Sequence, residues 1–317
     1  MPQGLVVIAH GTVDSLDDIP AFLTNIRRGH APPQELVDEV TRRYRAIGGK
    51  SPLNDTTRAV AEKLAAATGL PARACGRLFA PYPREAIDEL FALGVDELVV
   101  VPLAQHSAPL YVDAVRAAVR ESSKPETPVV GPANYGREPR LVRVFADRVE
   151  RALREIPADE LATTSVVFTA HSLPVAVVRA GDPYEAEFRA SVELVDAAVG
   201  VRPGMTSVCF QSQGMSQGPG GRPVEWMGPD LRKALEHEKA RGAKRVVIAP
   251  IGFLADHVEI LYDLDIEARA WAEELGLAAS RTVSLNADDA FIDALVAVIT
   301  PYLALPRTST DQAPGPA

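Results

Sequence analysis

A row of carboxylates in the second half of the chain is the first group of residues that could do chemistry. Glu259, Asp263 and Glu267 follow one another at intervals of four residues. In a helix, residues at this spacing lie on one face, roughly 6 Å apart along the axis, and like charges placed there repel each other. Such a row is most often a solvated surface face, and the alternative is a site for a cationic partner.

Three of the six histidines lie just past apolar runs of the kind that form buried strands. His10 follows "LVVIA", His106 follows "VVVPLAQ" and His171 follows "VVFTA". Because ligands of open α/β sheets bind beyond the carboxyl ends of the strands, these positions are candidates for a site. A single histidine is more often structural, and we interpret His106 and His257 in that way. His257 is close to Glu259 in sequence but is expected on another face of the helix.

His171 and Glu259 together could handle a metal ion or a proton. A neutral imidazole is a good ligand for borderline divalent metals and can accept a proton, and a carboxylate beside it would support either task. Two side chains are too few for a tight structural metal site. The metal would therefore be held briefly, with a substrate completing its coordination. Asp263 and Glu267 would extend the site outward as weaker oxygen ligands.

Continuous apolar runs rich in β-branched residues alternate with longer amphipathic segments along the chain. Such runs are typical of parallel strands that are covered on both faces. We expect strands at 4–10, 72–79, 97–104, 127–133, 165–172, 206–212, 245–252 and 281–287. The alternation of strand and helix, twice over, predicts an α/β fold of two doubly wound units, each with a parallel four-stranded sheet flanked by helices.

Residues 11–55 do not fit this alternation, because the segment is too long for an ordinary connection from a strand to a helix. We interpret it as a lip over the substrate site. The predicted organisation is a first unit at 1–130 that carries this insertion, a second unit at 131–286, a last helix at 287–305 that packs back on the first unit, and a disordered tail at 306–317.

Composition and charge restrict the class of protein. The 317 residues are 47% hydrophobic and 24% charged, as in soluble globular proteins, and the net charge of −9 argues against nucleic-acid binding. There is no signal peptide and no apolar run of transmembrane length, so we expect a cytoplasmic protein, with residues 19–23 as a candidate for weak peripheral membrane contact. Cys75 and Cys209 are expected to be buried free thiols, and two cysteines cannot ligate an all-cysteine iron–sulfur cluster.

Six segments, distributed over nearly the whole chain, carry a resemblance to a known family. They are "IRRGHAPPQELVDEVTRRYRAIGGKSPL" (26–53), "FTAHSLP" (168–174), "GDPY" (181–184), "FQSQG" (210–214), "WMGPD" (226–230) and "GFLADHVEILYDLDIE" (252–267). Together they resemble ferrochelatases. The resemblance implies a Rossmann-like two-domain chelatase with a porphyrin cleft, which inserts ferrous iron and releases two protons in haem biosynthesis. Iron would be a substrate, with no permanently bound cofactor, and neighbouring enzymes of the haem pathway would be candidate partners.

The resemblance also implies roles for individual residues. His171 and Glu259 match the family's active-site pair, in which either residue could take the proton or contact the metal. Asp263 and Glu267 match its acidic row. The residues expected to contact the porphyrin or its propionates are His10, Arg27, Arg28, Arg43, Tyr44, Ser51 and Tyr111. Arginine suits carboxylates because its planar fork donates two hydrogen bonds. His10 departs from relatives that have Tyr or Met before this glycine, and it could ligate the iron of the product.

Several alternatives stay open from sequence alone. Coproporphyrin III is favoured over protoporphyrin IX, because segment 25–53 resembles the bacterial coproporphyrin-type enzymes. Another tetrapyrrole chelatase, for cobalt or nickel, and a porphyrin- or haem-binding protein without enzymatic activity are the competing functions. A nucleotide-dependent dehydrogenase would need a G-x-G-x-x-G turn after the first strand, which "AHGTVDS" lacks. Arg27 and Arg28 could be a solvated pair, Tyr44 could pack in the core, and the Gly-rich loop 213–226 could change access to the cleft.

Overall fold

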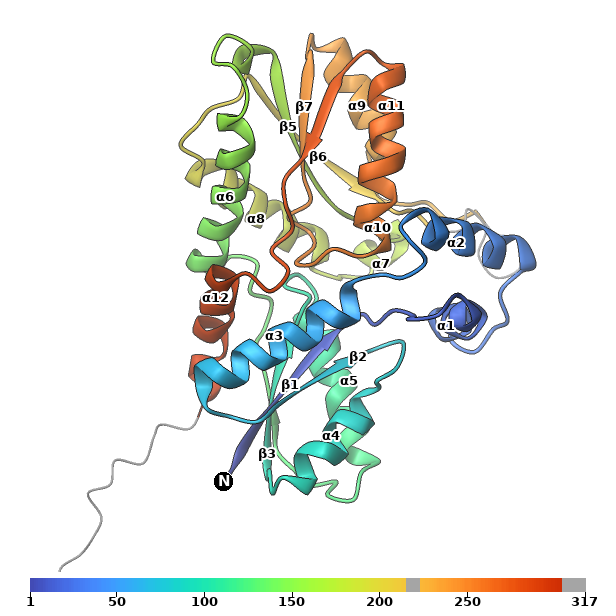
Figure 1. Cartoon of the computed structure of the whole chain (residues 1–317), viewed down its shortest axis with the longest axis vertical. Coiled ribbons are helices and arrows are strands. Elements are labelled where there is room, and N and C mark those ends of the chain that lie inside the picture. The colour runs from blue at the N-terminus through green and yellow to red at the C-terminus, as the bar shows by residue number, and fades with distance from the viewer. Residues whose placement is uncertain (215–222, 304–317) are drawn as a thin grey trace, which may run out of the picture.

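Two parallel four-stranded sheets form the framework of the computed structural model, which describes residues 1–214 and 223–303 (Figure 1). The first sheet has the order β2-β1-β3-β4, and its strands are β1 (Gln3–Ala9), β2 (Ala72–Gly76), β3 (Glu97–Pro102) and β4 (Val129–Val130). The second has the order β6-β5-β7-β8, and its strands are β5 (Thr164–His171), β6 (Met205–Gln211), β7 (Arg245–Ala249) and β8 (Ala278–Arg281). Both sheets thus share one topology, and the predicted α/β fold of two Rossmann-like units is confirmed.

The central strand of the first sheet contains a continuous apolar run because both of its faces are covered. Leu5 and Val7 of β1 face one buried cluster, whereas Val6 and Ile8 face another. This alternation follows from the two-residue repeat of a strand, whose successive side chains point to opposite faces. A strand buried on both sides therefore shows no polar alternation, which is why the apolar runs were good predictors here.

Helices connect the strands and flank both sheets. The first unit contains α3 (Leu53–Thr68), α4 (Pro83–Ala92) and α5 (Ala108–Arg120). The second contains α6 (Pro139–Arg154), η2 (Leu161–Thr163), α7 (Val175–Arg179), α8 (Tyr184–Ala198), α9 (Leu231–Ala240), α10 (Val258–Leu261), the π-helical η4 (Asp263–Ala268) and α11 (Arg269–Glu274). Local signals set several ends. Asp230 caps α9 by accepting a hydrogen bond from the Lys233 amide, and Gly69 ends α3 at φ 71, which glycine adopts without strain.

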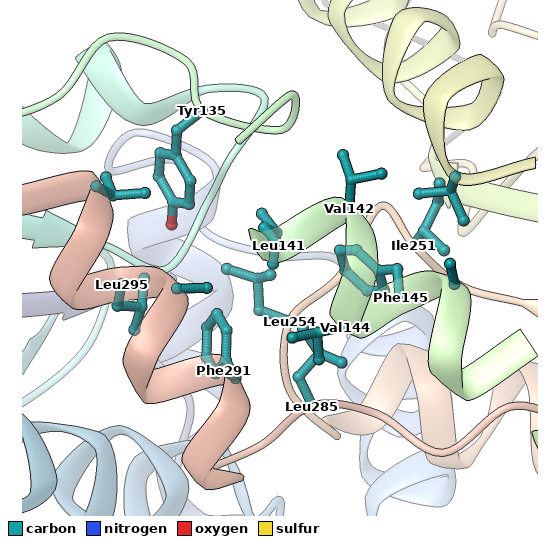
Figure 2. Packing of buried hydrophobic residues seen from close by; sticks show 14 of the residues in the cluster. Tyr135, Leu141, Val142, Val144, Phe145, Ile251, Leu254, Leu285, Phe291 and Leu295 are labelled. Atoms are coloured by element: carbon teal, nitrogen blue, oxygen red, sulfur yellow. The ribbon is translucent and has the colours of Figure 1, made fainter. Parts of the chain in front are cut away.

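A shared apolar core joins the two units (Figure 2). It includes Val7 of β1, Phe145 of α6 and Phe291 of the last long helix, α12 (Asp289–Ile299), which η5 (Thr300–Tyr302) follows. Figure 2 shows Phe291 among side chains of α6 and of the loops around Leu254 and Leu285. Helix α12 contacts both α3 and α6. Burying each large apolar side chain contributes roughly 1.5–3 kcal/mol, so packing fixes the placement of the two sheets.

The insertion between β1 and α3 folds into η1 (Leu16–Asp18), α1 (Ile19–Ile26) and α2 (Gln34–Ala46). Ile19, Phe22 and Leu23 of α1 are buried with Tyr44 of α2 in a small core of their own. The membrane contact predicted for residues 19–23 therefore lacks the large apolar side chains that it would need on the surface. None of the described helices is long and apolar enough to cross a membrane.

The last strand differs from the prediction. We expected a strand at 281–287, but β8 ends at Arg281, where it pairs with β7. The residues that follow leave the sheet, and Ser284 and Asn286 donate hydrogen bonds to the carboxylate of Asp256 at 2.7 and 2.9 Å. The prediction was wrong because an apolar pattern does not distinguish a strand from a connection whose polar side chains make tertiary contacts. The predicted tail at 306–317 and residues 215–222 of the loop at 213–226 lie outside the described residues.

Candidate active site

The candidate site forms where the carboxyl ends of β1 and β5 approach each other. His10 directly follows β1, and His171 is the last residue of β5. Glu259 lies on α10, beyond the end of β7. The charges of His171, His257 and Glu259 all influence His10, which places side chains of both units near one another. In Figure 1, β1 points toward α10. This is the edge at which open α/β sheets bind ligands.

His171 and Glu259 form a hydrogen-bonded pair. His171 Nδ1 lies 3.1 Å from Glu259 Oε2, and the two side chains are 34% and 32% exposed. Burial alone would lower the pKa of His171, but the Glu259 carboxylate raises it above its ordinary value. Burial would raise the pKa of Glu259, but His171 and His257 hold it well below its ordinary value. A carboxylate only accepts hydrogen bonds, so Nδ1 carries the hydrogen, and Nε2 of His171 is the nitrogen left to accept a proton or bind a metal.

A second imidazole flanks Glu259, contrary to the sequence prediction. His257 Nε2 lies 3.5 Å from Glu259 Oε2, and His257 Nδ1 lies 3.0 Å from the carbonyl oxygen of Ala255. We expected His257 on another helical face. That prediction was wrong because His257 precedes the helix, with an extended backbone (φ −158, ψ −176), so helical spacing does not apply to it.

The end of β6 holds the backbone of Glu259 in place. The amide nitrogen Nε2 of Gln211 donates to the Glu259 carbonyl at 2.8 Å, and the amide oxygen of Gln211 accepts from the Thr169 hydroxyl at 3.0 Å. Gln211 and Thr169 are buried and sit on adjacent strands. The last residues of β5 and β6 therefore position both members of the pair, His171 directly and Glu259 through Gln211.

Asp263 and Glu267 continue the row from Glu259, as their spacing predicts, but they do so within the π-helical η4. The Glu267 amide donates to the Tyr262 carbonyl, five residues back, at 3.0 Å. The Asp263 side chain is 7% exposed and accepts a hydrogen bond from the Ser212 hydroxyl. Burial and then the Glu259 carboxylate raise the pKa of Asp263 to about 7. At Asp263, the row is therefore not a solvated surface face.

Two arginines of the insertion reach this row. Arg43 Nη1 lies 3.2 Å from Asp263 Oδ1. Arg42 and Arg43 also lie over the ring of Tyr262, 5.2 and 5.1 Å from its centroid, and Arg42 donates a hydrogen bond to its hydroxyl. The chain itself thus supplies part of the cationic partner that the carboxylates need. The roles of Arg42 and Tyr262 could not be predicted from the sequence, because no local pattern reveals a contact between segments 220 residues apart.

Tyr44, Ser51 and Tyr111 lie in the interior rather than on an open surface. Tyr44 is 1% exposed, and its hydroxyl lies 2.6 Å from Thr12 Oγ1. Ser51 is 0% exposed, and its hydroxyl accepts from the Leu53 amide at 3.4 Å, at the start of α3. Tyr111 is buried as well. In this conformation the three residues offer little open surface to a porphyrin, and Tyr111, at 8% exposed, offers the most.

Arg27, Arg28 and Arg43 remain at least partly open to solvent. Arg27 and Arg28 follow α1, and Arg28 has a left-handed backbone with φ 55. Arg43 is held by its contact with Asp263. These guanidinium groups are the predicted porphyrin contacts that a carboxylate-bearing ligand could reach without a rearrangement of the core.

His10 is surrounded by protein and still reached by solvent. Burial, the largest influence, lowers the pKa of His10 to about 4, yet the side chain is exposed. His171 and Glu259 are likewise desolvated by the surrounding protein while about one third of each side chain stays exposed. Arg77, which the sequence analysis did not single out, donates its amide hydrogen to the Ala9 carbonyl at 2.9 Å and thereby extends the pairing of β2 with β1. Its charge also disfavours protonation of His10, which leaves a neutral imidazole able to bind a metal.

The remaining candidate residues have structural environments. His106 Nε2 lies 2.9 Å from Ser191 Oγ, and the His106 ring packs edge-on against Phe188. Cys75 and Cys209 are buried free thiols, as predicted, and burial raises the pKa of Cys209 to about 12. Within residues 1–214 and 223–303, no three His, Cys, Asp or Glu side chains converge in a way that could hold a metal ion.

Comparisons with known proteins point to one family. The family model described as Ferrochelatase matches residues 2–303. A ferrochelatase of Deinococcus radiodurans is 36% identical over 307 residues, covering 94% of this chain and 95% of that protein. A coproporphyrin III ferrochelatase of Geobacillus thermodenitrificans is 34% identical, with 95% and 96% covered. Among solved structures, SirB from Bacillus subtilis with Fe3+ is similar in fold, with a TM-score of 0.57 at 13% identity and 95% of each chain covered.

Proposed function

The chain belongs to the ferrochelatase family, and we propose that His171 and Glu259 are the pair with which it metallates coproporphyrin III. Its activity is the insertion of iron into a porphyrin in haem synthesis. The observation that carries the assignment of the pair is the 3.1 Å contact between His171 Nδ1 and Glu259 Oε2, two side chains that are each about one third exposed to solvent. We infer that the iron enters as the ferrous ion, whose two charges are balanced by the loss of the two N–H protons, so that the metallated core is neutral and no redox step is needed.

The proton chemistry follows from the tautomer of His171. The two pyrrole N–H bonds of the porphyrin break one after the other. Each proton passes to Nε2 of His171, which releases the first proton before it accepts the second, and the electron pair left on each nitrogen forms a bond to iron. Glu259 orients the imidazole through Nδ1–H and stabilises the imidazolium that results. Its carboxylate raises the pKa of His171, which makes the imidazole a stronger base than a free histidine. An alternative role for His171, direct contact with the metal, uses the same free nitrogen.

The acidic row offers a path for the released protons. Asp263 follows Glu259 on the same side of the segment, and its pKa of about 7 suits a group that takes up and releases protons near neutral pH. Glu267 stands one further turn away and also influences Asp263. We propose that protons leave the site along Glu259, Asp263 and Glu267, and that the same carboxylates attract the incoming cation as weak outer ligands.

The choice of porphyrin rests on charge. Coproporphyrin III carries four propionates, whereas protoporphyrin IX carries two, and the guanidinium groups of Arg27, Arg28 and Arg43 can each pair with a carboxylate. Arg43 would exchange its contact with Asp263 for a propionate. The relatives with the same chain coverage include proteins named coproporphyrin III ferrochelatases, which supports this choice.

His10 belongs to the first unit and lies near enough to His171 and Glu259 of the second for their charges to influence it. We propose that its neutral imidazole contacts the opposite face of the macrocycle and ligates the iron of the product. Cytoplasmic location and contacts with neighbouring enzymes of the haem pathway stay predictions from the sequence.

An anaerobic metallation assay tests the proposed function. The protein is mixed with ferrous iron, or in parallel samples with cobalt or nickel ions, and either coproporphyrin III or protoporphyrin IX, and the absorption spectrum is followed. We expect the free-base spectrum to convert into that of the iron complex, faster with coproporphyrin III. Faster conversion of protoporphyrin IX would contradict the substrate assignment. A spectrum that shifts on binding but never converts would favour a porphyrin-binding protein, and conversion only with cobalt or nickel would favour another chelatase.

A further inference from the structure

We propose that Arg281 is a positioning residue for the metallation site, which it reaches only through other side chains. Arg281 is the last residue of β8 and is 15% exposed. Its Nε and Nη2 donate to the two carboxylate oxygens of Asp265 at 2.8 Å each. Its Nη1 donates to Ser284 Oγ at 3.3 Å and lies 3.4 Å from Asp256 Oδ1. One guanidinium therefore contacts both Asp256 and Asp265.

Asp256, one of the two aspartates that Arg281 contacts, is also hydrogen-bonded to the connection that follows β8. Asp256 Oδ1 accepts from the Ser284 hydroxyl at 2.7 Å, and Oδ2 accepts from the Asn286 amide at 2.9 Å. The Asp256 amide in turn donates to Asn286 Oδ1 at 2.8 Å. The Asp256 carboxylate thus has partners on both oxygens, which a partly buried charge requires. The connection after β8 therefore serves to hold the turn that precedes α10.

The two aspartates that Arg281 joins stand on either side of the proposed chemistry. Asp256 lies three residues before Glu259, and Asp265 lies two residues after Asp263. Within the described residues, no hydrogen bond or ion pair joins Arg281 to Glu259 or to Asp263. Because its contacts lie just outside that pair, Arg281 fixes the turn before α10 relative to η4, and with it the separation of the two carboxylates.

The segment between these two aspartates needs such support. It changes from α-helical to π-helical geometry at Asp263, and π-helical turns are rare and occur frequently at functional sites. Its carboxylates also repel one another, since Glu259 raises the pKa of Asp263. A planar guanidinium with five fixed donors holds two carboxylates in one geometry better than the flexible ammonium of a lysine would.

The test compares Arg281 with an arginine in the same sheet that is bonded to a carboxylate at the other end. Arg245 is the first residue of β7, and its Nε and Nη2 donate to Glu160 Oε2 at 3.2 and 2.8 Å. Arg245→Met thus removes a guanidinium that donates two hydrogen bonds to one carboxylate, far from the candidate site. Arg281→Met, the milder Arg281→Lys and Asp265→Asn are assayed beside it for kcat, for the KM of the porphyrin and for the unfolding midpoint.

The inference rests on the proposed roles of Glu259 and Asp263, so Glu259→Gln is measured in the same assay. We expect kcat of Arg281→Met to fall by about 10-fold or more, as for residues that orient a ligand, with the KM of the porphyrin within about twofold of wild type. Arg281→Lys and Asp265→Asn should lose less, and Arg245→Met should keep its kcat. The inference is overturned if Arg281→Met and Arg245→Met have equal kcat while Glu259→Gln is inactive. Activity in Glu259→Gln would instead overturn the proposed function.

Discussion

Arg43 of the insertion and Asp263 of η4 form an ion pair with 3.2 Å between Nη1 and Oδ1. The contact joins a segment that interrupts the regular β/α alternation to the acidic row of the second unit. Asp263 is buried beside the Glu259 carboxylate, and Arg43 supplies the opposing charge. The packing of α2 against the second unit and the ionisation of Asp263 are therefore coupled. A change in either one should be detectable through the other.

Asp263 should make the protein less stable as the pH rises. The groups that face it are Glu259, Glu267, Arg43 and the Ser212 hydroxyl, and its pKa rises from 3.8 to about 7 on folding. Between these values the folded state keeps a proton that the unfolded chain has released, so stability falls from about pH 4 to pH 7 and stays lower above that range.

Asp263→Asn removes this titration. The free energy of unfolding of the variant, relative to wild type, should therefore increase between pH 5 and pH 8, by roughly 1–3 kcal/mol, since each unit of pKa shift corresponds to about 1.4 kcal/mol. Urea unfolding of both proteins at the two pH values measures the difference. An identical difference at pH 5 and pH 8 would show that Asp263 ionises normally.

Tyr262 should hold α2 against the second unit. Two guanidinium groups lie over its ring, and each such contact is worth about 0.5–1 kcal/mol at partly exposed sites. Tyr262→Leu should therefore speed the hydrogen exchange of α2 amides by roughly 5- to 30-fold. Tyr262→Phe keeps the ring and is the matched control, with a smaller effect. Equal exchange of α2 in Tyr262→Leu and wild type would contradict the contact, and amides of α4 serve as an internal reference.

Tyr44 should contribute to stability rather than to porphyrin binding. Its hydroxyl and that of Thr12 lie 2.6 Å apart in the interior. Tyr44→Phe leaves the Thr12 hydroxyl without this partner and should cost about 1 kcal/mol of unfolding free energy. Porphyrin affinity, measured by fluorescence titration, should stay within about twofold. A loss of affinity without a loss of stability would restore Tyr44 to the list of substrate contacts.

His10 should leave a spectroscopic signature on the product. If its imidazole ligates the iron of the product, His10→Ala should change the absorption spectrum of the product complex, because the axial ligand sets the electronic state of the iron. His237→Ala, which removes an exposed histidine of α9, is the matched control and should leave the spectrum unchanged. A product spectrum identical in His10→Ala and wild type would rule out the ligand role.

The sequence predicted the parts of the fold that depend on local pattern. The apolar runs marked the strands because both faces of each sheet are covered, and the four-residue spacing of Glu259, Asp263 and Glu267 correctly placed them in one row. The strand predicted at 281–287 was wrong because Ser284 and Asn286 hydrogen-bond to Asp256. Periodicity in the sequence does not reveal tertiary contacts of this kind. The predicted orientation of His257 was wrong because that residue precedes the helix, so helical spacing does not apply to it.

The central pair of the candidate site could be predicted from the sequence, but the residues that hold the pair in place could not. His171 and Glu259 emerged from position and resemblance, and the structure brings them together. No sequence pattern singles out Arg42, Arg77 and Arg281, because arginines are common and only the tertiary fold decides which of them contact the site or support it.

The central claim is that His171, oriented by Glu259, removes the protons from the porphyrin. Single-turnover metallation of coproporphyrin III by His171→Ala, under anaerobic conditions with ferrous iron, tests it most directly. We predict a rate lower by on the order of 100-fold or more, the contribution expected of a positioned base, with porphyrin binding largely retained. Metallation by His171→Ala at the wild-type rate would contradict the account.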